Sequence, residues 1–215
     1  MTLMTPLKLS RPSRRYALAL VCVFALSIPG ARANDSKSIK GFREAIIKLS
    51  PTTVDPSEAA QVAVISHETA RRLAKEWRVV PPANFQNFLI HIGKRQRGFC
   101  FHWAHGIGKE LRKVPFKTLQ FYWAEADART RLEHNVIVVT ALGQPMNTGY
   151  IIDGWRNAGR LVWWPVLKDD VVWKENAVET AWMQNRGDDP LKALDEPLAP
   201  ANAAATPATR QARRN

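Results

Sequence analysis

The sequence predicts an α+β domain in which helices come first and an antiparallel sheet follows. In the first half of the chain, apolar residues recur at three- and four-residue steps, as they do on the buried face of a helix. After about residue 117 the period becomes two, and β-branched and aromatic residues dominate, as they do in strands. Because helices precede strands instead of alternating with them, we expect N-terminal helices packed on an antiparallel sheet.

Length and composition are those of one globular domain. The chain has 215 residues, of which 46% are hydrophobic, so it can bury a core and is not disordered throughout. Its two cysteines exclude a disulfide-rich scaffold and a four-cysteine zinc site. We place the domain at residues 55–187, after a polar lead-in at 34–54 and before a disordered tail rich in Pro, Ala and Arg at 188–215.

Residues 1–33 have the pattern of a signal peptide. Basic residues without acids are followed by an apolar stretch, 17–28, which is shorter than the roughly 20 residues that span a bilayer. Small residues at 31–33 then resemble a cleavage site. We expect an exported bacterial protein, periplasmic or secreted, without membrane insertion once the leader is removed. Ser13-Arg14-Arg15 leaves twin-arginine export open beside the general route.

The net charge of +12 is of the kind found in nucleic-acid-binding proteins, but part of it belongs to the expected leader. Five basic residues belong to the leader, which leaves 26 basic against 19 acidic residues and a net charge of +7. The remaining positive charges are dispersed, with a local group at 94–97. We therefore expect no nucleic-acid partner. Cys22 leaves with the leader, so Cys100 is the one cysteine of the expected mature chain.

Capping residues and prolines in the sequence predict where the first two helices begin and end. The lead-in has the pattern of a short helix over 38–49. A longer helix begins after Asp55, which is a typical N-cap, with Glu58 at the capping-box position. Pro81-Pro82 ends this helix.

The rest of the chain divides into two helices and four strands. A short helix over 84–92 is followed by a basic turn at 94–98 and by a second apolar-periodic helix over 99–111. The four predicted strands cover residues 118–125, 135–142, 150–155 and 161–166.

Cys100 is the strongest candidate for a reactive residue. It follows Gly98, where the basic turn meets a helix. A thiol at a helix N-terminus meets unpaired N–H groups and the positive end of the helix dipole. Arg95 and Arg97 add positive charge, and such surroundings favour the nucleophilic thiolate.

His134 and Asp153 follow Cys100 in the order that a Cys-His-Asp triad requires. His134 comes at the start of one predicted strand, and Asp153 lies in the next. His134 would take the thiol proton, and Asp153 would orient the imidazole. The two are directly opposite if the hairpin turn is centred on residues 143–144. A turn centred on Met146 would instead turn Asp153 to the other face and favour Asn157.

This pattern resembles the transglutaminase-like branch of the papain-like cysteine hydrolases. The resemblance lies in Gly-Phe-Cys opening a helix, Glu-His-Asn-Val-Ile-Val opening a strand, and Tyr-Ile-Ile-Asp-Gly-Trp in the next strand. It implies a papain-like core with Cys100, His134 and Asp153 as catalytic residues. It also suggests the bacterial periplasmic members that cleave proteins. Phe101 and His102 follow the cysteine where those members commonly carry calcium-binding acids, so we expect no calcium requirement.

We therefore predict an exported thiol hydrolase that cleaves an amide bond in a protein or cell-wall peptide by acyl transfer, without a cofactor. The backbone N–H of Cys100 would form part of the oxyanion hole, with Gln96 or Gln86 as a second donor. Trp155 would lie beside the substrate cleft, and with Gln96 it is our predicted substrate-binding residue.

Two other functions compete with this one. The first is a non-catalytic binding module on the same fold, with an aromatic groove formed by some of the many tryptophans after residue 99. The second is a small zinc-binding protein, whose ligands would be Cys100, His102, His105 and His134.

Overall fold

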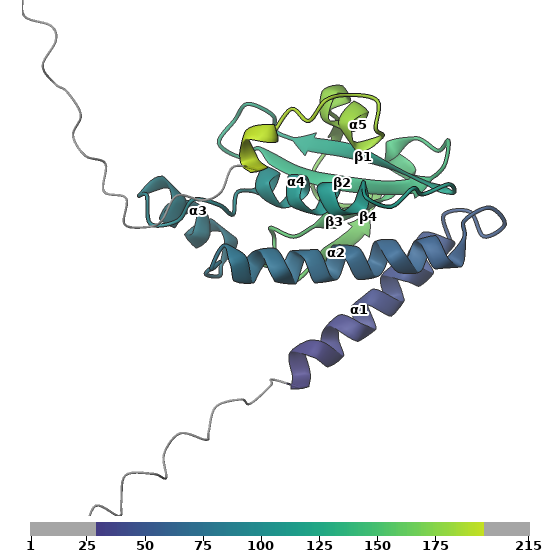
Figure 1. Cartoon of the computed structure of the whole chain (residues 1–215), viewed down its shortest axis with the longest axis horizontal. Helices are drawn as coiled ribbons and strands as arrows, with labels where there is room; N and C mark the ends of the chain where they lie inside the picture. The colour runs from purple at the N-terminus through teal and green to yellow at the C-terminus, as the bar shows by residue number, and fades with distance from the viewer. Residues whose placement is uncertain (1–28, 196–215) are drawn as a thin grey trace, which may run out of the picture.

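The computed structural model describes residues 29–195 and shows an α+β architecture with N-terminal helices packed against a five-stranded antiparallel sheet (Figure 1). The predicted fold class is confirmed at that level. Residues 1–28 of the expected signal peptide and 196–215 of the expected tail lie outside the described residues. Within 29–195, no helix combines the length and apolar character that a bilayer span requires.

The first helix is longer than expected. α1 (Pro29–Ile47) includes most of the polar lead-in and the last residues of the predicted signal peptide, whereas the sequence indicated a helix only over 38–49. A tertiary contact lies within the added part of the helix. The Asp35 carboxylate accepts two hydrogen bonds from the Arg71 guanidinium of the second helix, at 2.7 and 2.8 Å. This contact has no local sequence signal.

The second helix, α2 (Pro56–Glu76), begins where Asp55 predicts. Oδ1 of Asp55 accepts hydrogen bonds from two backbone N–H groups of the first turn, which confirms the N-cap. The expected capping box is wrong. The Glu58 carboxylate accepts from the backbone N–H groups of Lys117 and Thr118, and the Asp55 N–H donates to the Thr118 hydroxyl. Glu58 thus ties the start of the helix to the start of the sheet.

The remaining helices are α3 (Ala83–His91), α4 (Cys100–Leu111) and α5 (Ala177–Met183). The first two agree with the sequence-based prediction to within a residue or two. α5 was not anticipated. It packs against the first strand, where the Thr180 hydroxyl accepts the backbone N–H of Trp123 at 3.0 Å. A seven-residue helix carries too weak a periodicity to be recognised from sequence.

The sheet has the strand order β4-β3-β2-β1-β5, and every neighbouring pair is antiparallel. Four of its strands were predicted, and the two-residue β5 was not. β3 ends at Asp153, two residues earlier than expected, because Oδ1 of Asp153 accepts the backbone N–H groups of Trp155 and Arg156 and turns the chain. The strands are β1 (Leu119–Ala126), β2 (His134–Ala141), β3 (Tyr150–Asp153), β4 (Val162–Pro165) and β5 (Lys174–Glu175).

α4 lies between α2 and the sheet, so it is buried on two sides (Figure 1). Gly106 makes the approach to α2 possible, because a Cβ there would lie 2.6 Å from Cδ1 of Leu73. The larger core fills the space between helices and sheet and contains Ile137 of β2. A smaller core on the other face contains Val136 and Val138. This packing brings the first residue of α4 to the beginning of β2.

Candidate active site

Cys100 is the first residue of α4, and its side chain is nearly buried, with 9% of the residue exposed. As the first helical residue, it contributes one of the four backbone N–H groups that a helix leaves without an internal acceptor. These groups and the helix dipole favour negative charge at the thiol. The sequence-based placement of Cys100 at a helix N-terminus is confirmed.

The turn before Cys100 is fixed by contacts on all sides. Gly98 has φ +129°, a conformation that side chains disfavour, and a Cβ there would lie 2.7 Å from Cγ of Gln86. The Gly98 carbonyl accepts the indole N–H of Trp103 at 3.0 Å. Nδ1 of His102 accepts the backbone N–H groups of Gly98 and Phe99 at 3.3 and 3.1 Å. The backbone that carries the thiol is therefore preorganised.

His102 acts here as a neutral acceptor. Burial lowers its pKa to about 4, and the positive charges of Arg97 and His105 act in the same direction. At neutral pH the ring is uncharged, so Nδ1 can accept while Nε2 carries the proton. His102 is thus a cap of the helix that presents Cys100, a role that the sequence did not indicate.

His134 and Asp153 are joined by a hydrogen bond. Nε2 of His134 lies 2.7 Å from Oδ2 of Asp153, which is 1% exposed. The strand register differs from the predicted one: Ile137 pairs with Ile152, and continuing this register puts Asp153 opposite Val136 instead of His134. The shift is two residues, so Asp153 stays on the same face as His134, and the two side chains meet diagonally.

The loop between β2 and β3 explains this register. It contains a 3₁₀ turn, Met146–Thr148, in place of a tight two-residue turn, so the pairing is centred between Gln144 and Pro145. The alternative centred on Met146 is excluded, and with it the placement of Asn157 as the partner of His134. Asn157 is exposed in the loop after β3.

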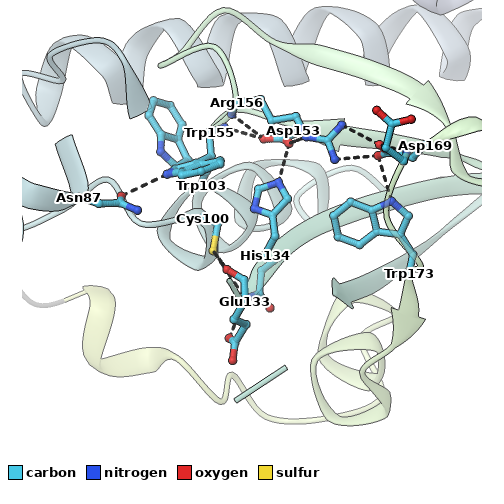
Figure 2. A network of polar contacts seen from close by, with 12 residues as sticks. Asn87, Cys100, Trp103, Glu133, His134, Asp153, Trp155, Arg156, Asp169 and Trp173 are labelled. Carbon is cyan, nitrogen blue, oxygen red and sulfur yellow. Dashed lines mark hydrogen bonds and ion pairs between the residues drawn. The ribbon is translucent and has the colours of Figure 1, made fainter. Parts of the chain in front are cut away.

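The His134 ring lies between Cys100 and Asp153, and its second nitrogen points toward the sulfur (Figure 2). This Nδ1 atom is buried and has no hydrogen-bond partner among residues 29–195. Burial lowers the pKa of His134, but the hydrogen bond to Asp153 and the neighbouring Cys100 sulfur outweigh it and raise the pKa to about 9. The imidazolium form of His134 is therefore favoured at neutral pH.

Besides the His134 ring, two polar groups of the described residues contact the sulfur. Sγ of Cys100 lies 3.6 Å from the backbone carbonyl of Glu133, to which the thiol donates, and 3.7 Å from Nδ2 of Asn135, which donates to the sulfur. Both residues flank His134 at the start of β2. Neither was a candidate from the sequence, although their adjacency to a candidate histidine was a signal that could have drawn attention to them.

A second layer of charged and aromatic residues surrounds the pair of His134 and Asp153. Nε of Arg156 lies 3.1 Å from Oδ2 of Asp153, and its terminal nitrogens bind Asp169 at 3.1 and 2.8 Å. Asp169 also accepts the indole N–H of Trp173 at 3.0 Å. Burial would raise the pKa of Asp169, but the bonds from Arg156 and Trp173 hold it below its usual value. The sequence pattern did not place Arg156 or Asp169 at the site, nor Trp173 beside them.

Two tryptophans confine the His134 ring. The ring centroids of Trp155 and Trp173 lie 4.9 and 5.5 Å from that of His134. Trp155 is half-buried, donates its indole N–H to Asn87 of α3 at 3.2 Å and lies near His134 (Figure 2). Its expected place beside a substrate cleft stays a prediction.

Gln86 and Gln96 were the two glutamines proposed as a second oxyanion donor. Gln86 is 1% exposed, and its amide is committed to backbone groups, accepting from Val80 at 3.0 Å and donating to Arg97 at 2.8 Å. It therefore holds the turn before α4 and is not free to bind an oxyanion. Gln96 is exposed in that same turn, and its role in substrate binding stays a prediction.

The alternative zinc site is not assembled. His102 caps α4, His134 binds Asp153, and Nε2 of His105 lies 3.0 Å from Asp189. No cluster of three or more metal-ligating side chains occurs within the part of the chain that the structure describes. The contact with His105 also packs Asp189, which the sequence analysis assigned to the disordered tail, onto α4.

Neither a protein-family model nor a solved structure matches the chain. The assignment of chemistry therefore rests on the geometry of the site. A thiol at a helix N-terminus, an imidazole with one nitrogen toward that thiol, and a buried carboxylate on the other nitrogen form the constellation of a nucleophile, a base and an orienting group. Such a set is suited to acyl transfer.

Proposed function

We propose that this chain is an exported thiol hydrolase that cleaves an amide bond in a protein or cell-wall peptide by acyl transfer through Cys100. The observation that carries the proposal is the position of the His134 ring. Its Nε2 is held by the buried Asp153, and its Nδ1 faces Cys100 without another partner among the described residues. A histidine that served only to fill the core would have both nitrogens satisfied.

At neutral pH the raised pKa of His134 keeps its ring protonated, so Nδ1 already holds the proton of the Cys100 thiol; in the first half of the reaction the Cys100 thiolate attacks the carbonyl carbon of the substrate amide. A carbon–sulfur bond forms, and the carbonyl oxygen becomes an oxyanion. The imidazolium then gives its proton to the amide nitrogen, the carbon–nitrogen bond breaks, and the amine leaves. The products of this half are a free amine and a thioester on Cys100.

In the second half, His134 removes a proton from water, and the resulting hydroxide attacks the thioester. The carbon–sulfur bond breaks, a carboxylic acid is released, and the Cys100 thiolate and the His134 imidazolium are restored. Asp153 stabilises the imidazolium in both halves by accepting from Nε2 at 2.7 Å. The backbone N–H of Cys100 is available to the oxyanion at the helix N-terminus.

The wider assignments belong to the same proposal. The order of Cys100, His134 and Asp153 on a helix and two adjacent antiparallel strands supports membership of the transglutaminase-like branch of the papain-like cysteine hydrolases. The composition of residues 1–33 supports export to the periplasm or the medium. The substrate is a protein or peptide, and no nucleic acid is part of the proposal.

Alkylation and cleavage test the proposal together. Iodoacetamide labelling of the native full chain should modify Cys100 at pH 6–7, and peptide mass spectrometry separates this label from one on Cys22. His134→Ala should slow labelling at neutral pH by about tenfold or more, because the thiolate loses its base. Amide cleavage, scored as new amino termini in unfolded protein and cell-wall peptide substrates, should disappear in Cys100→Ala.

His134→Ala should lower that cleavage by two to four orders of magnitude. Exposed His91 on α3 supplies the control, because His91→Ala should change neither readout. The proposal is overturned if Cys100 reacts only after denaturation, or if cleavage persists without it.

A further inference from the structure

Asn135 is a buried polar residue in apolar surroundings, and one of its contacts is the reactive sulfur. It is 5% exposed and shares the face of β2 that α4 covers with Ile137 and Val139, both of which belong to the larger core. An amide placed there is costly unless its donors and acceptor are satisfied. The hydrogen-bond partners of the Asn135 amide therefore indicate its role.

The orientation of the Asn135 amide follows from the chemistry of its neighbours. The indole N–H of Trp123 lies 2.8 Å from Oδ1 of Asn135, and an indole nitrogen can only donate. Oδ1 must therefore face Trp123, which leaves Nδ2 on the side of Cys100. The group that meets the sulfur at 3.7 Å is thus a donor.

Glu133 holds the same amide from a second side. Its Oε1 accepts from Nδ2 of Asn135 at 2.9 Å, and its Oε2 accepts the backbone N–H of Arg129 at 2.7 Å. One N–H of the amide is committed to this carboxylate. The other is the one that reaches Sγ of Cys100, and the three bonds together fix the amide plane.

We infer that Asn135 is a further catalytic residue, whose side-chain N–H binds the sulfur of Cys100 and stabilises its thiolate. The inference rests on the proposed function and names a donor for the charged form of its nucleophile. The two polar groups that contact the sulfur besides His134 suit its two charge states. The Glu133 carbonyl accepts the hydrogen of the neutral thiol, whereas the Asn135 amide donates to the thiolate once His134 has taken the proton.

The pH dependence of alkylation measures this contribution without any substrate. The rate of iodoacetamide labelling at Cys100 rises to a plateau as the thiolate forms, and the midpoint reports the thiolate equilibrium. A change in accessibility alters the plateau rate and leaves the midpoint where it was. In Asn135→Ala the midpoint should move up by about one pH unit, which is about tenfold less thiolate at a pH below both midpoints.

Two further variants keep the test decisive. Trp123→Phe removes the donor that orients the amide and keeps Asn135, so the midpoint should move in the same direction by a smaller amount; it decides the case if Asn135→Ala does not fold. Asn147 is exposed on the loop after β2, and Asn147→Ala is the matched control with no expected shift. Near-ultraviolet circular dichroism checks that each variant is folded.

An unchanged midpoint in a folded Asn135→Ala or Trp123→Phe protein overturns the inference and leaves Asn135 as a structural residue. This result is distinct from failure of the proposed function. If the midpoint is higher in Asn135→Ala than in the wild type but the wild type cleaves no substrate, the contact with the thiolate is supported and the hydrolase proposal is wrong. If the wild type cleaves substrate and the midpoint is the same in Asn135→Ala, the hydrolase proposal is supported and Asn135 does not stabilise the thiolate.

Discussion

Arg156 and His134 share one oxygen atom of Asp153. Oδ2 of this carboxylate lies 2.7 Å from Nε2 of His134 and 3.1 Å from Nε of Arg156. The guanidinium is held in place by its two bonds to Asp169. A permanent positive charge thus competes with the imidazolium for the same acceptor. Arg156 is a positioning residue for the carboxylate.

Removal of that charge should raise the pKa of His134 further. In Arg156→Gln, Asp153 loses the cation beside Oδ2, so the imidazolium becomes its sole charged partner and is stabilised. NMR titration of the His134 ring measures the change, and the alkaline decline of cleavage should move to higher pH with it. Arg160→Gln, at an exposed arginine four residues later, should leave the titration as it is in the wild type. A lower pKa of His134 in Arg156→Gln would contradict this account.

Asp153→Asn should lower the pKa of His134 and remove a pH dependence of stability. The pKa in the folded chain is about 9, above the usual value of about 6.5, so the bond contributes fully below pH 6.5 and is lost as the pH rises through 9. Urea unfolding of the wild type should show the free energy of unfolding falling by about 2–3 kcal/mol over that window. In the variant the decline should be absent, and cleavage should fall by two orders of magnitude or more.

Because of His102, we expect the folded chain also to lose stability as the pH falls. The pKa of His102 is about 4 in the folded chain, so the unfolded chain binds a proton that the folded chain rejects between pH 6.5 and 4. The free energy of unfolding should therefore fall as the pH drops through that range. His102→Gln keeps an acceptor at the third helical position and does not titrate. It should hold the cap of α4 while reducing the acid sensitivity, whereas His102→Ala should lose about 1–2 kcal/mol at neutral pH.

Gly98→Ala should damage both stability and thiol reactivity. Its φ of +129° disfavours a side chain, and the new Cβ would lie 2.7 Å from Cγ of the buried Gln86. We expect a loss of about 2–3 kcal/mol in urea unfolding and slower alkylation of Cys100. Gly93→Ala is the matched control. It also has a positive φ, but nothing lies within 4 Å of its Cβ, so its loss should be about 1 kcal/mol.

The local chemistry of the sequence predicted the parts of this molecule that depend on neighbours along the chain. Asp55 begins α2 because its side chain caps the N–H groups next to it. Cys100 lies at the start of α4 because a glycine turn precedes an apolar-periodic helix. The order of Cys100, His134 and Asp153 was visible for the same reason, since each lies at a recognisable boundary of a helix or strand.

Tertiary structure decided everything that depends on residues distant in the sequence. The register of β2 and β3 followed from the long loop between them, and its two-residue shift kept Asp153 on the face of His134 because side chains alternate along a strand. The Arg156 guanidinium is held by Asp169, 13 residues later in the chain, and Asn135 gained its role from its contact with Cys100 of α4; no local pattern encodes either contact. The sequence alone therefore named the proposed nucleophile and its two proposed partners, and packing determined the atoms through which the three residues meet.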